Sequence, residues 1–237
     1  MKTLAVICAA VWAAAALAAD TTISSGAGAA DSGPGPSADG TRELRWDNGT
    51  RQYLVCWYTG EESWAGNDFS ESLAKRDYGD TGGQNLRVIS VRVYTSNKWP
   101  NERWDGFRIG IFSILGEPEP VPGDRLWPQT GNGYFFKPTG PRGEYWVEIP
   151  VDWTTSDTNF VAAMEQVYDQ PRCDPFAVDS NPIFKRRSWS YYGGLWQRLE
   201  TISDPYFNLM LRVVVEDRPY FPAAAPTSFG RVKALYR

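Results

Sequence analysis

The amino-acid sequence predicts an all-β fold: an antiparallel two-sheet β-sandwich of jelly-roll-like type with essentially no helix. Apolar and polar residues alternate with a period of two in several segments. Turn-forming residues separate these segments, and no run of about twelve residues keeps a helical period between caps. Roughly seven to nine strands within about 175 residues are enough to build two packed sheets.

Six segments carry the strand pattern and are rich in Val, Ile or aromatic residues. They are residues 52–59, 86–94, 106–115, 144–150, 159–168 and 208–216. Residues 72–78 (SLAKRDY) contain a good helical run, but the segment is short and surrounded by glycine, which favours a strand. The turns between segments contain Asp47-Asn48-Gly49, Gly82-Gly83 and the proline-rich stretches 118–123, 138–143 and 171–182.

Residues 187–199 (RSWSYYGGLWQRL) are predicted to form a β-hairpin. The Gly193-Gly194 pair can take the positive φ angles of a two-residue type I′ turn. Tyr191 would then face Trp196 across the hairpin, and Trp189 would face Arg198. That register places Arg187, Trp189, Tyr191, Trp196 and Arg198 on one face. The two arginines favour an outward orientation for this face, with the core as the alternative.

The N-terminal residues predict export. Residues 1–18 combine Lys2, an apolar stretch and the small-residue site Ala16-Leu17-Ala18, which is typical of a secretory signal peptide. Residues 19–41 are mostly Gly, Ala, Ser and Pro, so we expect a flexible leader. The protein should therefore be secreted, extracellular or attached to the cell surface, with no transmembrane segment after signal cleavage.

The β-sandwich domain is predicted to cover residues 42–217. Residues 218–226 read as a Pro/Ala linker. The last segment, 227–237, is too short to fold alone and is expected to dock on something through its apolar residues. Those residues are Phe229, Val232, Leu235 and Tyr236.

Composition excludes several kinds of function. The chain has no histidine, which removes Ser-His-Asp and Cys-His nucleophile systems and the usual imidazole zinc ligands. A net charge of −4 without a basic run is typical of a poor nucleic-acid binder, so no nucleic-acid partner is expected. Cys56 and Cys173 follow the signal, and an exported protein can join them by a disulfide worth about 4–5 kcal/mol. Two separate buried thiols are the alternative.

The 11 Trp, 12 Tyr and 11 Phe exceed what a sandwich core needs, so some rings should lie at a surface. Trp146 shares a strand face with Glu144 and Glu148, which suits a sugar platform unless a long loop or a Lys or Arg stem covers the ring. Trp99 and Trp104 lie in a loop, where they either bind a ligand or anchor the loop. The candidate ligand-binding residues are Trp99, Trp104, Trp146, Trp189, Tyr191 and Trp196.

No catalytic residue, cofactor or metal ligand is predicted. The carboxylate pairs Glu144/Glu148 and Glu165/Asp169 would each lie about 13 Å apart along a strand. That separation is too large for a glycosidase unless an acid from another strand contributes. Asp residues near Gly and Asn could hold a structural Ca²⁺, but turn formation explains them more simply. They are Asp47, Asp80, Asp174 and Asp179.

Five motifs occur in a fixed order: WDNG (46–49), PGDRLW (122–127), GEYWVEIP (143–150), RSWSYYGGLW (187–196) and NLMLRVVVE (208–216). This series resembles a β-sandwich accessory module common in large secreted and surface proteins of bacteria. The ending SFGRVKALYR resembles short terminal segments on such chains. The resemblance implies an extracytoplasmic, non-catalytic module of the kind found beside proteases, glycosidases or adhesins.

Three functions follow as hypotheses. The first is a secreted module that binds carbohydrate or another cell-surface component through exposed aromatic residues. The second is a structural surface-assembly or filament subunit that docks through its terminal segments, for example by strand addition. The third is a carboxylate-based glycoside hydrolase. A binding module predicts that exposed rings gather on one face.

Overall fold

A computed structural model describes residues 41–57, 62–69, 85–100, 102–116, 121–155, 159–179, 187–199 and 208–218. This part of the chain is built from β-strands and contains no α-helix, so none of it forms a helix that could cross a membrane. The strands are β1 (Thr41–Leu44), β2 (Tyr53–Val55), β3 (Ser63–Asp68), β4 (Asn85–Ser96), β5 (Phe107–Leu115), β6 (Val121–Trp127), β7 (Tyr134–Phe136), β8 (Glu144–Thr155), β9 (Phe160–Gln166), β10 (Phe176–Asp179), β11 (Ser188–Tyr192), β12 (Leu195–Arg198), β13 (Asn208–Leu209) and β14 (Leu211–Arg218).

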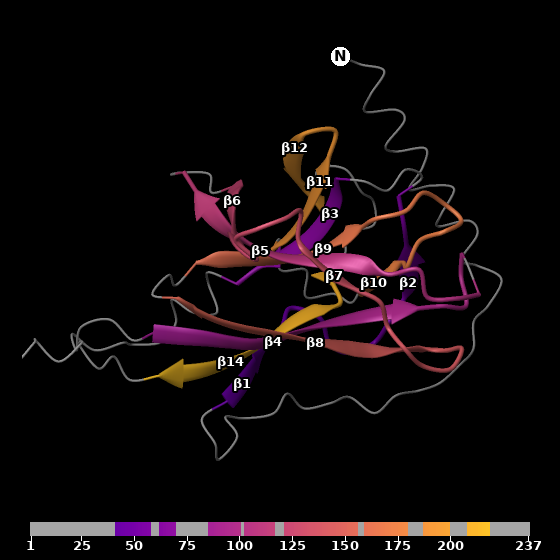
Figure 1. Cartoon of the computed structure of the whole chain (residues 1–237), viewed down its shortest axis with the longest axis horizontal. Coiled ribbons are helices and arrows are strands. Elements are labelled where there is room, and N and C mark those ends of the chain that lie inside the picture. Colours follow the sequence, from indigo (N-terminus) through magenta and orange to yellow (C-terminus); the bar gives the residue numbers. More distant parts are fainter. Residues whose placement is uncertain are drawn as a thin grey trace, which may run out of the picture.

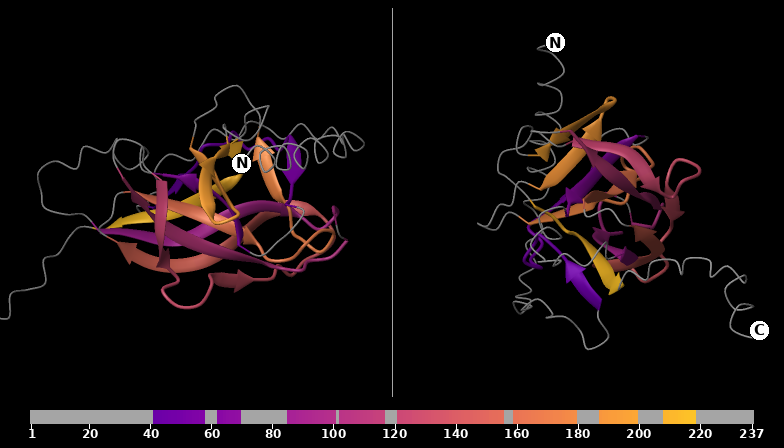
Figure 2. Two further views of the ribbon diagram at one scale, coloured as in Figure 1. Left: turned by 90° about the horizontal axis from the view of Figure 1, so that it is seen from above. Right: turned by 90° about the vertical axis from the view of Figure 1, so that its left-hand side faces the viewer.

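The strands pair into three antiparallel sheets (Figure 1). One sheet has four strands in the order β1-β14-β4-β8, and a small sheet has the order β13-β10-β2. The seven-stranded sheet has the order β12-β11-β3-β9-β5-β6, with β7 also paired to β5. The strands twist strongly, and one sheet curls into a half-barrel (Figure 2).

The main hydrophobic core lies between the four-stranded and the seven-stranded sheet. Val91 of β4 and Ile149 of β8 point into it from one side, and Ile109 of β5 and Met164 of β9 from the other. All four side chains are 0% exposed. Burying a side chain of this size contributes about 1.5–3 kcal/mol, so this shared core holds the two sheets together.

The outer face of the four-stranded sheet carries a buried ionic network around Arg212. Its guanidinium binds Asp47 at 2.6 Å and Glu43 at 2.9 Å, and it lies 4.1 Å from the ring centroid of Trp146. Arg212 belongs to β14, Glu43 to β1 and Trp146 to β8. The network therefore ties edge strand β1 to the rest of its sheet.

The all-β, antiparallel class predicted from the sequence is confirmed for the described residues. The two-sheet sandwich is not confirmed, because the strands divide among three sheets. The expected number of strands is corrected, since the described residues alone contain β1 to β14, more than the seven to nine expected. The predicted signal peptide, the 72–78 strand, the 227–237 segment and most of the leader and linker lie outside the described residues; Thr41, the last leader residue, belongs to β1.

The predicted hairpin at 187–199 is confirmed residue by residue. Tyr191 pairs with Trp196 and Trp189 pairs with Arg198, as the two-glycine turn requires. Gly193 and Gly194 have φ angles of 63° and 85°, the left-handed values of a type I′ turn. The turn residues alone therefore set the register of β11 against β12.

Cys56 and Cys173 are free thiols in this structure, so the predicted disulfide is not present in it. Both side chains are buried, and Gln170 Nε2 donates a hydrogen bond to Cys56 Sγ at 3.0 Å. The pKa of the Cys173 thiol lies far above its ordinary value because the thiol hydrogen-bonds to Cys56 and is buried. The two thiols are thus neighbours, and a bond between them stays a prediction.

Candidate functional site

The strongest candidate site is a cleft on the face of the seven-stranded sheet that is turned away from the main core. Alternation along each strand decides which side chains reach this face. On β3, Ala65 joins the main core while Trp64 belongs to a second cluster on the opposite face. On β5, Ile109 and Ile111 face the core while Arg108 and Phe112 line the cleft.

Strand pairing brings aromatic rings from four strands together in this cleft. Tyr191 of β11 lies opposite Trp64 of β3 on one side and Trp196 of β12 on the other. Phe112 of β5 completes a continuous series, because its ring centroid is 5.0 Å from that of Trp64 and 5.3 Å from that of Trp196. Tyr191 and Trp196 are 5.2 Å apart. Trp64 and Phe112 are almost fully buried, whereas Tyr191 and Trp196 are half-exposed.

Small residues make room for these rings. Gly66, Ala163 and Gly110 form one row across β3, β9 and β5. A Cβ added to Gly66 would come within 2.6 Å of the Ala162 carbonyl oxygen, and one added to Gly110 would lie 3.1 Å from the Trp64 ring. The indole of Trp64 therefore lies across the sheet surface instead of standing upright on it.

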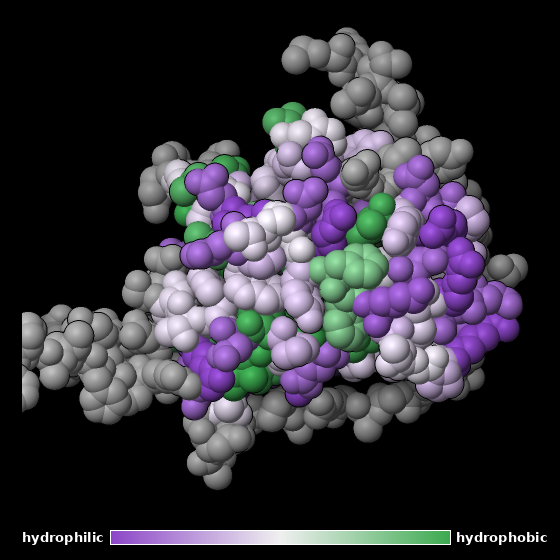
Figure 3. Space-filling view, viewed as in Figure 1, coloured by the Kyte–Doolittle hydropathy of each residue, from purple (hydrophilic) through white to green (hydrophobic). Residues whose placement is uncertain are grey.

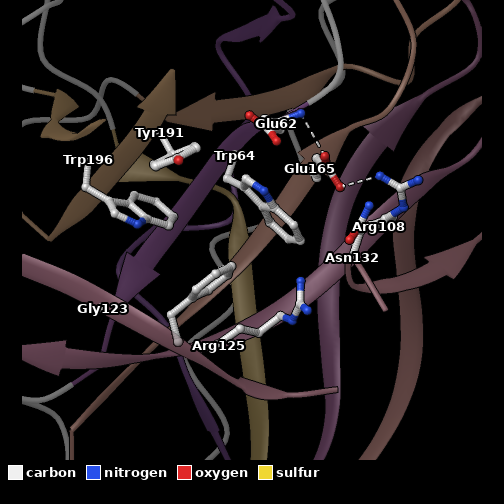
Figure 4. A pocket seen from close by; sticks show the side chains of 10 residues that line it. Glu62, Trp64, Arg108, Gly123, Arg125, Asn132, Glu165, Tyr191 and Trp196 are labelled. Atoms are coloured by element: carbon white, nitrogen blue, oxygen red, sulfur yellow. Dashed lines mark hydrogen bonds and ion pairs between the residues drawn. The ribbon is translucent and has the colours of Figure 1, made fainter. Parts of the chain in front are cut away.

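The adjacent row of paired residues, Trp64, Glu165 and Arg108, brings charged side chains into the cleft. Glu165 of β9 is 2% exposed and lies between Trp64 and Arg108 in the sheet. Its carboxylate accepts a hydrogen bond from the Glu62 backbone N–H at 2.8 Å and pairs with the Arg108 guanidinium at 2.9 Å. Both oxygens of Glu165 are thus engaged, and Oε1, which accepts the Glu62 N–H, holds Glu62 at the cleft with a φ of 65° (Figure 4).

Other polar groups in the cleft have free hydrogen-bonding capacity. No hydrogen bond or ion pair within the protein is made by the Glu62 carboxylate, the Asn132 amide or the Tyr191 hydroxyl, all of them among the described residues. Figure 4 shows Glu62 and Arg125 on opposite sides, with Trp64 between them. The cleft has a volume of about 250 Å³, which suits a small group such as one sugar ring rather than a folded partner.

The six aromatic residues predicted from the sequence do not form one cluster. Trp189, Tyr191 and Trp196 belong to the cleft face, which therefore looks away from the main core as expected. Trp189 is 3% exposed, with Arg198 4.5 Å above its ring, so it supports the other rings. Only Tyr191 and Trp196 are placed to touch a ligand.

The other three predicted rings lie elsewhere. Trp146 packs against Tyr94 at 5.5 Å and under Arg212, which is the covered alternative considered from the sequence. Trp99 packs in the same small cluster as Trp146. Trp104 is 6% exposed and packs edge-on to Tyr145 at 5.5 Å. These three rings serve packing in this structure and do not extend the cleft.

The carboxylates considered for catalysis are also separated. Glu144 pairs with Arg51 at 2.9 Å, and Glu148 pairs with Arg92 at 2.9 Å, both on the four-stranded sheet. Glu165 reaches the cleft but is neutralised by Arg108. No group of three or more metal-ligating side chains occurs among the described residues.

Sequence reasoning missed seven of the residues that line the cleft. They are Glu62, Trp64, Arg108, Phe112, Gly123, Arg125 and Asn132. Trp64 and Phe112 carried a usable signal, because each is an aromatic residue two positions away from a glycine. The two motifs are WAG, which begins at Trp64, and GIF, which ends at Phe112. Glu62, Arg125 and Asn132 carried none, since only strand pairing brings them to the same place.

In comparisons with known proteins, no family model matches the chain, and no curated protein or solved structure matches it either.

Proposed function

We propose that this chain is an exported, non-catalytic module of the jelly-roll-like β-sandwich class that binds carbohydrate in the cleft of its seven-stranded sheet. One observation carries the proposal: half-exposed rings lie beside side chains with free donors and acceptors. A sugar offers an apolar ring face for stacking and hydroxyls that both donate and accept, so it matches both kinds of group. Export is supported by residues 1–18, and the sandwich class by the core shared between two sheets.

The cleft is also built on rigid elements. Its rings stand on strands that share one sheet, and the Phe112 ring is held between the rings of Trp64 and Trp196. A ligand would meet a site that is already formed, which reduces the entropy cost of binding. Catalysis has less support, because the buried carboxylate of the site is committed to Arg108 and to the Glu62 backbone.

Binding to a panel of polysaccharides tests the proposal. The full secreted chain should be retained on at least one polysaccharide matrix, and Trp196→Ala should weaken retention about ten-fold, since one stacked ring contributes roughly 1–1.5 kcal/mol. Trp99→Ala is the matched control, because it removes a half-buried Trp outside the cleft. Equal loss in both variants, or no retention of the wild type on any matrix, would reject the proposal.

The surface-assembly alternative rests on residues 227–237, which lie outside the described residues. Apolar residues on the face seen in Figure 3 form separate small patches. The large exposed apolar side chains of the described residues likewise fall into small groups: Leu115 lies opposite Val121, Tyr192 lies opposite Leu195, and Tyr134 and Phe135 are neighbours in β7. No feature of the described residues favours assembly over ligand binding.

A further inference from the structure

We infer that the cleft selects acidic polysaccharides, with a sugar carboxylate bound by Arg125. This inference rests on the proposed carbohydrate-binding function and adds the charge class of the ligand. It starts from the only cleft guanidinium, among the described residues, that has no carboxylate partner.

Arg125 differs from the other arginines near the cleft. Arg108 pairs with Glu165 at 2.9 Å, and Arg187 pairs with Asp68 at 3.3 Å. Arg125 instead donates from Nε to the Pro128 carbonyl oxygen at 3.1 Å and from Nη2 to the Gly131 carbonyl oxygen. Neutral carbonyls hold a guanidinium in place but leave its charge uncompensated. A half-buried cation without a counter-ion gains more from an anionic ligand than a solvated one does.

The geometry of these two bonds leaves the right donors free. The carbonyls occupy the side edge of the guanidinium, formed by Nε and Nη2. Its end edge, formed by Nη1 and the second hydrogen of Nη2, keeps two parallel donors. Two parallel N–H groups are the pattern that a carboxylate accepts with both oxygens. Figure 4 shows this end of Arg125 extending into the cleft toward Trp64 and Asn132.

The surroundings favour a sugar acid over a simple anion. Arg125 lies opposite Phe112 in the β5–β6 pairing, so a carboxylate bound to it sits beside the aromatic series. The ring that carries this carboxylate can then contact Trp196, while its hydroxyls reach Asn132 or Glu62. Glu62, on the far side, accepts hydroxyl hydrogen bonds and repels a second carboxylate. The cleft therefore fits one hexuronate residue whose acid group points toward β6.

Bulk electrostatics act against this preference. The chain has a net charge of −4, so an acidic polymer is repelled at long range. Any affinity for an acidic polymer over its neutral counterpart must come from a local cation. That makes the inference testable at a single residue.

The test measures affinity by isothermal titration calorimetry with the full secreted chain at physiological salt. The probes are polygalacturonate, the same polymer with its carboxyl groups reduced to alcohols, and dextran with and without sulfate groups. We expect the wild type to bind polygalacturonate at least ten-fold more tightly than the reduced polymer. Arg125→Gln should abolish this preference, so that the variant binds the native and the reduced polymer with equal affinity.

Two further variants control the result. Arg142→Gln removes a positive charge outside the cleft, from a residue paired with Glu102, and should keep the wild-type preference. Arg125→Lys keeps the positive charge without the paired donors and should retain only part of the preference for the native polymer. The comparison of native and reduced polymer in the wild type needs no variant, so it decides the question even if Arg125→Gln disturbs the loop at Pro128.

The possible outcomes distinguish failure of the acidic preference from failure of the proposed carbohydrate-binding function. Equal binding of native and reduced polymer, with loss on Trp196→Ala, overturns the acidic preference and leaves carbohydrate binding standing. Preference for sulfated dextran alone overturns the assignment to a carboxylate. No binding to any of the four polymers, and none to the wider polysaccharide panel, overturns the proposed function itself.

Discussion

The Asp174 carboxyl should make the protein more stable at pH 5 than at pH 8. Its side chain is 1% exposed, and burial raises its pKa from 3.8 to about 6. Backbone N–H groups of Gly106 and Asp105 donate to it at 2.8 and 3.3 Å and offset part of that rise. The Asp105 carboxylate raises the pKa and Lys137 lowers it.

The direction and size of the effect follow from linkage. Because the pKa is higher in the folded state, the folded protein binds a proton between about pH 4 and 6 that the unfolded chain releases. This group therefore adds stability as the pH falls through 6, and the gain is lost as the pH rises again. Between pH 8 and pH 5 the gain is about 1.4 kcal/mol, or about 3 kcal/mol once the pH is below both pKa values.

Urea unfolding at pH 5, 6, 7 and 8 measures this gain. The wild type should gain about 1.4 kcal/mol in its free energy of unfolding between pH 8 and pH 5. The Asp174→Asn variant has no titrating carboxyl at this position, so it should not show this gain. Asp124→Asn removes an exposed carboxylate and should keep the increase. If wild type and Asp174→Asn change in parallel across this range, the carboxyl is not desolvated as described and the reasoning fails.

Three further predictions concern stability. Arg212→Gln should lower the free energy of unfolding by about 3–5 kcal/mol in urea titration, because Asp47 and Glu43 lose their buried cation; a change below 1 kcal/mol would contradict this. Gly66→Ala should cost about 1–3 kcal/mol in the same titration, since its Cβ would meet the Ala162 carbonyl oxygen at 2.6 Å; an unchanged free energy of unfolding would contradict this. The chain should lose two hydrogens by intact mass when Cys56 and Cys173 pair in oxidising conditions, and Cys173→Ser should not change mass in this way.

The sequence predicts best the parts of the fold that are set by local rules. The segments 86–94, 106–115 and 144–150 alternate, and they form β4, β5 and β8. The hairpin followed from two glycines alone, because a type I′ turn fixes the pairing of the residues around it. The face of Trp189, Tyr191 and Trp196 followed from the same register.

Strand β3 was missed for a physical reason. All six of its residues are buried, because the main core covers one face of its sheet and the aromatic cluster covers the other. A strand buried on both faces has no polar side to alternate with apolar residues. The sequence SWAGND also mixes small and polar residues, which resembles a turn more than a strand. Trp64 was lost from the predicted site together with its strand.

The distribution of rings in the sheet links stability to recognition. Trp64, Phe112 and Trp189 are nearly inaccessible to solvent, so a ligand gains little direct contact with them. Their packing instead fixes the orientation of Tyr191 and Trp196, the two rings that a ligand can reach. Substituting a buried ring should therefore lower the stability of the fold and also weaken binding, because the neighbouring rings lose their fixed orientation. Substituting Trp196 should weaken binding with a smaller effect on stability. That contrast distinguishes a ligand platform from a second hydrophobic core, because a core would lose stability at every one of these positions.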